Sequence, residues 1–230
     1  MNLPRRLRDP LPWLGALSLA LLATLILRDP LDVAVAGYAL PAMLTALVLL
    51  ATAVWWPIVR DQRPNPAAFD AIALRGGLSV AAILGSGFVA TMATGTDEAR
   101  RDAIVWASIA GAAAVFAMTS WIAVQVSGVG TGLLASLVAA AYAALALVAL
   151  EIVVQSTAPS LFGSSIAAQW PPASIIGDSG IALRATIDRL LAQLLALPVL
   201  ALAVGSLSCL AARVGGLAPR LAAPGEPSTS

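Results

Sequence analysis

The chain has 230 residues, of which 60% are hydrophobic and 11% are charged, and its mean hydropathy is +0.91. Soluble domains carry about 25% charged residues, so this composition excludes the soluble class and indicates a polytopic membrane protein. A net charge of +1, no histidine and a single cysteine, Cys209, argue against a nucleic-acid partner, zinc or haem cofactors and an intrachain disulfide.

Six apolar stretches each come near the roughly 20 residues that a membrane-spanning helix needs. They lie at about 11–27, 33–56, 78–95, 103–127, 132–154 and 189–213. The first is followed by Arg28-Asp29-Pro30 and lacks the small residues of a signal-peptide cleavage site. We therefore expect one all-α transmembrane domain over 1–220, with pseudo-repeats at 11–95 and 103–213. A Pro-, Ala- and Ser-rich tail at 221–230 is expected to be disordered.

The arginines predict the orientation of these helices. In a six-helix topology, eight fall on one side and five on the other, the eight being those at 5, 6, 8, 60, 63, 75, 213 and 220. Because arginine and lysine are retained on the cytoplasmic side, both termini are expected in the cytoplasm, most simply at a bacterial inner membrane.

Two segments between the predicted helices are unusually apolar. Asn65 and Pro66 suit the N-cap and first position of a short helix over 65–74, which is about 15 Å long and half a bilayer deep. The second segment, 156–183, contains one acid and includes Trp170-Pro171-Pro172-Ala173. Irregular apolar backbone at membrane depth is tolerated where it lines a cavity, so both segments are expected to be re-entrant.

This arrangement resembles the major intrinsic protein family, the aquaporins and glycerol facilitators. Asn65-Pro66-Ala67 stands between the second and third helices, and Pro171-Pro172-Ala173 between the fifth and sixth. Pro198 and Gly205 resemble that family's sixth-helix pattern. The resemblance implies six transmembrane helices with two re-entrant half-helices, a homo-tetramer, and a passive channel for water or glycerol-like neutral solutes.

The sequence departs from that family at the expected constriction. Pro171 stands in place of the second asparagine, Ser174 in place of the usual arginine, and Ala149 near the position of the histidine. These small, uncharged residues imply a wider filter than one selective for water. The resemblance implies that the pore is lined by Asn65, Pro66, Ala67, Ala149, Pro171, Pro172, Ala173 and Ser174.

Other chemistry is thinly represented. Gly177-Asp178-Ser179-Gly180 imitates a serine-protease segment, but no histidine can take the serine proton, and we expect no enzyme. Glu151 is the only acid inside an apolar stretch, and we expect it at a solvated helix end with Gln155, Arg184 or Arg189 as partners. A non-conducting subunit of a larger membrane complex and a secondary transporter remain the alternatives to a channel.

Overall fold

The computed structural model describes residues 66–94, 97–157 and 178–214, together with the isolated residue Ala20. These residues form four long helices: α4 (Pro66–Ala93), α5 (Glu98–Ser127), α6 (Val129–Thr157) and α8 (Asp178–Val214). Each contains a stretch long and apolar enough to cross a membrane, namely Ala68–Thr91, Glu98–Val126, Val129–Glu151 and Ala192–Val214. The chain therefore has the all-helical character of an integral membrane protein. The predicted helices at 11–27 and 33–56, and the tail, lie outside the described residues.

Local sequence signals set the ends of α5 and the start of α6. The Asp97 carboxylate caps α5 by accepting a hydrogen bond from the backbone N–H of Arg100 at 3.1 Å. At the other end Gly128 has a φ of 93°, a conformation that side chains disfavour, and its N–H donates to the Val124 carbonyl at 2.9 Å. One glycine therefore ends α5 and lets α6 begin at the next residue.

α6 is the central helix of this bundle. It packs against α4, α5 and α8, and 61% of its apolar span is buried, against 33%, 22% and 28% in α4, α5 and α8. Its Tyr142, Leu145 and Leu147 are among the largest fully buried side chains, together with Phe116 of α5. The outer helices instead present large apolar side chains outward, as expected for surfaces that contact lipid.

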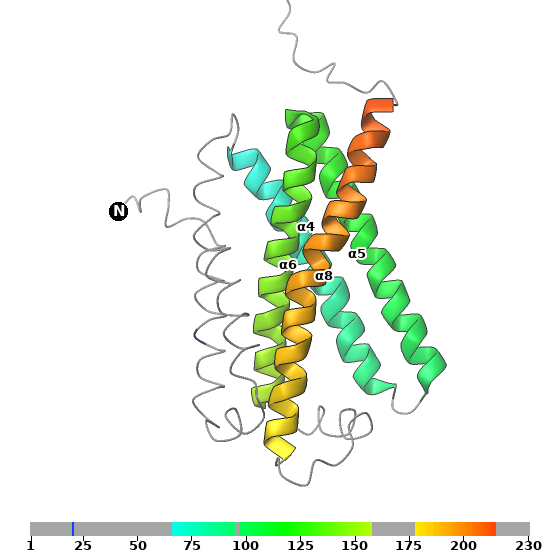
Figure 1. The fold of residues 1–230 in the computed structure, drawn as a ribbon, viewed down its shortest axis with the longest axis vertical. Coiled ribbons are helices and arrows are strands. Elements are labelled where there is room, and N and C mark those ends of the chain that lie inside the picture. The colour runs from blue at the N-terminus through cyan, green and yellow to red at the C-terminus, as the bar shows by residue number, and fades with distance from the viewer. Residues whose placement is uncertain (1–19, 21–65, 95–96, 158–177, 215–230) are drawn as a thin grey trace, which may run out of the picture.

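The helices alternate in direction along the chain, so α4 and α6 run one way and α5 and α8 the other (Figure 1). The contacts of α4 agree with this, because its Gly77 lies against Tyr142 of α6 and its Gly85 lies against Leu150 further along. At the lower end of the view, α4 and α5 stand away from α6 and α8. The helices thus cross near the middle of the view, and the two pairs diverge toward its lower end.

The predicted separate half-helix over 65–74 is wrong. Residues 66–74 are the first turns of α4, which continues without interruption to Ala93. A 28-residue helix is about 42 Å long, so its first residue lies at a membrane face and not at half depth. The predicted start at Pro66, the first helical position, is confirmed.

Gly76 and Gly77 lie in the interior of α4, although two glycines in a row disfavour a helix. In the structure they lie where α4 meets two neighbours. A Cβ on Gly76 would collide with Thr119 of α5, and a Cβ on Gly77 would lie 2.6 Å from the Ala139 carbonyl oxygen of α6. These glycines are required by close helix packing and do not end the helix.

α8 begins eleven residues before the predicted start at 189, because Asp178 to Asp188 are already helical. The protease-like segment therefore ends in the first turn of this helix, with Asp178 as its first residue. Pro198 lies in the interior of α8, where it removes one backbone donor. The apolar segment 158–177 lies outside the described residues.

Candidate functional site

The most unusual group in the described bundle is the carboxyl of Glu151. Its residue is 1% exposed. The side-chain amide of Gln193 on α8 donates from Nε2 to Glu151 Oε1 at 2.5 Å, across a gap of 42 positions in the chain. A hydrogen bond of this kind is about twice as strong when the carboxyl is ionised as when it is neutral. An ionisable group thus lies between two helices, held by a neutral amide.

Apolar packing surrounds this pair along both helices. Leu147 and Val148, one turn before Glu151 on α6, are 2% and 0% exposed. Leu194 and Leu197 of α8 are 7% and 6% exposed. In such surroundings a carboxylate is costly unless it is paired or hydrogen-bonded.

The prediction that Glu151 lies at a solvated helix end is therefore wrong. Six residues of α6 follow it, and it lies eight residues, or about 12 Å, beyond the middle of the helix. A helix centred on a ~30 Å hydrocarbon layer keeps such a position within that layer. Gln193 is one partner of this carboxyl, and the side chains of Gln155, Arg184 and Arg189 lie outside the described part of the chain.

A second set of polar contacts joins α8 to its neighbours at the opposite end of the bundle. Ser120 Oγ of α5 donates to the Gly205 carbonyl at 3.3 Å, and Ser136 Oγ of α6 lies 3.2 Å from the Ala201 carbonyl. The Cys209 thiol donates to the Val129 carbonyl at 3.4 Å. All three use backbone acceptors and small side chains, which is the usual way that apolar helices are held together. They indicate packing and offer no chemistry to a solute.

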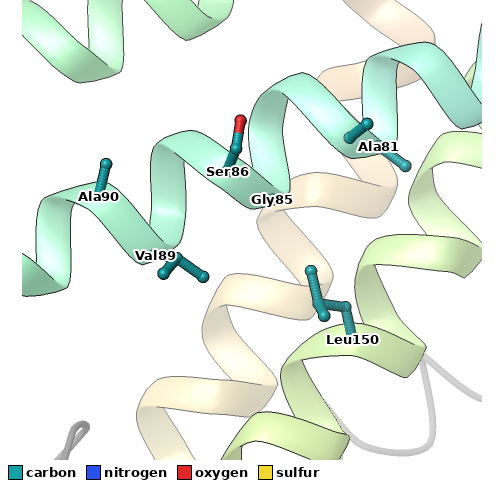
Figure 2. Close-up of a pocket in the computed structure, with 7 residues that line it drawn as sticks. Ala81, Gly85, Ser86, Val89, Ala90 and Leu150 are labelled. Atoms are coloured by element: carbon teal, nitrogen blue, oxygen red, sulfur yellow. The ribbon is translucent and has the colours of Figure 1, made fainter.

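A groove of about 470 Å³ opens between α4 and α6 (Figure 2). Its walls are small or aliphatic, and its labelled residues are Ala81, Gly85, Ser86, Val89, Ala90 and Leu150. The one hydroxyl, Ser86 Oγ, donates within its own helix to the Ile83 carbonyl at 2.9 Å. The groove thus presents no charged side chain to a solute and is suited to apolar chains.

The structure separates the predicted pore residues that it describes. Pro66 and Ala67 open α4, whereas Ala149 is half-buried near the end of α6. Because α4 and α6 run in the same direction, these positions lie at opposite ends of the bundle (Figure 1). Asn65 and the segment 171–174 lie outside the described residues, so the expected meeting of Asn65 with Pro172 stays a prediction.

Sequence reasoning missed Gln193. The residue lies inside the apolar stretch 189–213, where an amide is as conspicuous as the carboxyl of Glu151 in the preceding stretch. A search for all polar side chains within apolar stretches, and not only for acids, would have singled out Gln193, together with Gln125 in the stretch 103–127. The proximity of Gln193 to Glu151 depends on how α6 and α8 pack.

No protein family, no curated protein and no solved structure matches the chain.

Proposed function

We propose that this protein is a membrane transporter that couples the movement of a small solute to an ion, with Glu151 as the ion-handling group. The observation that carries the proposal is the burial of this carboxyl between α6 and α8, against the amide of Gln193. Ionisable groups inside membrane proteins are rare and commonly mark ion pathways or proton relays.

A transporter has better support than the channel that the sequence resemblance implied. The channel mechanism needs two half-helices whose positive N-terminal ends meet at half depth. The first of these is instead the start of the full-length helix α4. Secondary transporters need an ionisable coupling site within the bundle. Glu151 meets that need because it is buried.

The proposal is tested with the protein reconstituted in lipid vesicles. The vesicles are given an equimolar mixture of amino acids, sugars and polyols, and the solutes taken up are measured by mass spectrometry. Proton and sodium gradients are imposed in separate experiments. We expect at least one solute to accumulate above its external concentration under one of the two gradients. Glu151→Gln should abolish that accumulation, and Glu98→Gln, which changes an exposed acid on α5, should preserve it.

Two other outcomes would contradict the proposal. Permeation down a concentration gradient without accumulation under any ion gradient would favour a channel. Vesicles indistinguishable from protein-free ones would favour a non-conducting subunit of a larger membrane complex, which the small-residue helix faces also suit.

A passive channel for water or glycerol-like solutes is the second candidate. Its support is that α4 begins at Pro66, directly after Asn65, as the resemblance implied. Ser174 and Ala149 are small, so such a channel should admit glycerol ahead of strictly selective water flow. Stopped-flow swelling with water and with glycerol, for the native chain and for Ser174→Arg, measures this. Native permeability equal to that of empty vesicles for both would exclude it.

The finer topology is proposed on sequence grounds. Two further helices at 11–27 and 33–56 would complete six crossings, with both termini in the cytoplasm of a bacterial cell and the bundle in its inner membrane. The exposed apolar faces are compatible with a homo-oligomer, a tetramer if the channel candidate holds.

A further inference from the structure

We propose that the ion bound at Glu151 is a proton. When it binds, the side-chain amide of Gln193 turns over, so that its oxygen faces the carboxyl in place of its nitrogen. The inference rests on the proposed transport function only for its purpose, since proton binding can be measured without any solute. It concerns two side chains on different helices, so protonation is coupled to the contact between α6 and α8.

The first step of the argument is the hydrogen bond in the structure. Gln193 presents its donor, Nε2, to Glu151 Oε1, which is the arrangement that an ionised carboxylate favours. The other amide atom, Gln193 Oε1, is buried and has no hydrogen-bond partner among the described residues. A buried acceptor of this kind carries a desolvation cost that a nearby donor would remove.

Protonation of Glu151 supplies that donor. A proton from water adds to one carboxyl oxygen, so an O–H bond forms and the carboxyl changes from one negative charge to none. A protonated carboxyl donates one hydrogen bond, and half a turn of the Gln193 amide would bring Oε1 to accept it. The last torsion of glutamine is broad and nearly two-fold, so the backbone need not move. Each charge state of Glu151 therefore favours its own amide orientation.

A metal cation fits the site less well. Calcium takes six to eight oxygen ligands and magnesium six, whereas the amide here presents nitrogen to the carboxylate at 2.5 Å and leaves no space between them. Among the described residues, no three His, Cys, Asp or Glu side chains lie together in a group suited to a metal. A proton needs no further ligand at this pair, whereas calcium and magnesium would.

The charged residues of the four described helices are the other groups that a change of pH could affect. α6 carries no charged residue besides Glu151, and α4 carries none after Arg75. On α5 the nearest charges by position are at its first turns, at Glu98, Arg100, Arg101 and Asp102. On α8 the charged residues are Asp178, Arg184, Asp188 and Arg189 before Gln193, with side chains outside the described set, and Arg213 in the last turn. A pH response of the pair must be separated from titration of these groups.

The sequence permits a direct measurement, because the chain has only three glutamates, Glu98, Glu151 and Glu226. In a Glu98→Gln/Glu226→Gln background, ¹³C-labelled glutamate reports on Glu151 alone. Infrared spectra of the reconstituted protein are recorded as the pH is lowered. We expect the labelled carboxylate band to be replaced by the band of a protonated carboxyl. Protection of Cys209 from a maleimide verifies that the protein stays folded.

Two variants test the role of the amide. Gln193→Met removes the donor that favours the carboxylate. Because hydrogen bonds to charged groups are stronger than those to neutral groups, the ionised form loses more than the protonated form. The proton concentration for half-protonation should therefore fall about tenfold. Gln125→Met, which changes a half-buried glutamine on α5, should leave it unchanged. The infrared band of the Gln193 amide should shift at the same pH as the carboxyl band. This shift should be absent in Gln193→Met and present in Gln125→Met.

The outcomes separate this inference from the proposed function. If the carboxyl titrates and the amide band follows, but no solute accumulates under any gradient, the proton site stands and the transporter fails. If the labelled carboxyl never protonates while the protein remains folded, the proton site is refuted, although sodium-driven accumulation would still support a transporter. If the carboxyl titrates identically in Gln193→Met, Gln193 is not its sensor.

Discussion

Replacing Gly77 with alanine adds a single methyl group at the closest approach of α4 to α6. The new Cβ would lie 2.6 Å from the Ala139 carbonyl oxygen and would also collide with the Cβ of Tyr142. Neither neighbour is the far end of a flexible side chain, so the helices must move apart. Overpacking of a core costs about 1–3 kcal/mol.

The helix itself partly offsets this cost, because alanine is favoured over glycine in a helix interior by about 1 kcal/mol. The net destabilisation of Gly77→Ala should therefore be about 1 kcal/mol, within a range of about 0–2. For a chain of this size that lowers the melting temperature by about 2–4 °C. Gly130→Ala is the matched control, since its Cβ would meet nothing within 4 Å on the exposed first turn of α6.

The chain's only cysteine serves as the reporter. Cys209 is 8% exposed, so a dye that fluoresces on reaction with a thiol reads unfolding in detergent during a temperature ramp. Gly130→Ala should melt at the native temperature or up to about 3 °C above it. A melting temperature for Gly77→Ala equal to or above that of the control would refute the close contact between α4 and α6.

Three further expectations follow from the described contacts and the arginine count. Gly128→Ala, at a φ of 93° where side chains are strained, should cost about 1–3 kcal/mol in the same assay, and an unchanged melting temperature would contradict that backbone conformation. Ser136→Ala removes a bond to a carbonyl of α8 and should cost about 0.6 kcal/mol, so that a loss above 2 kcal/mol would point to a larger role. In a Cys209→Ser background, a single cysteine at Ser160 should react with an impermeant maleimide applied outside cells, and one at Ser228 should not. Labelling of Ser228 from outside would reverse the proposed orientation.

The boundaries of α5 and α6 could be predicted from sequence to within about five residues, because a cap at Asp97 and a glycine at 128 flank long apolar runs. The continuity of α4 could not. Gly76-Gly77 has the local character of a break, and only the neighbouring helices show why glycine is needed there. Local propensity was overridden by packing between segments more than 40 positions apart.

The candidate site, too, could be predicted from the sequence only in part. That Glu151 is an acid in an apolar run was visible in the sequence, but its exposure was predicted wrongly because distance from a helix end says little about what packs alongside. Its bond to Gln193 joins two helices and depends on their relative register. Pairing of this kind is a tertiary property that one sequence without relatives does not reveal.

The paired glycines of α4 also have a mechanical consequence. Where Gly76 and Gly77 touch α5 and α6, the helices cannot move closer together. A tilt of α4 would therefore pivot about this crossing. From Gly77 to Ala93 the arm of α4 is about 24 Å long, and a tilt of about 10° about the crossing would displace its end by about 4 Å. Relative movement of the helix pairs would then be smallest at the crossing and largest at the diverging end, toward which the last turns of α6 run (Figure 1).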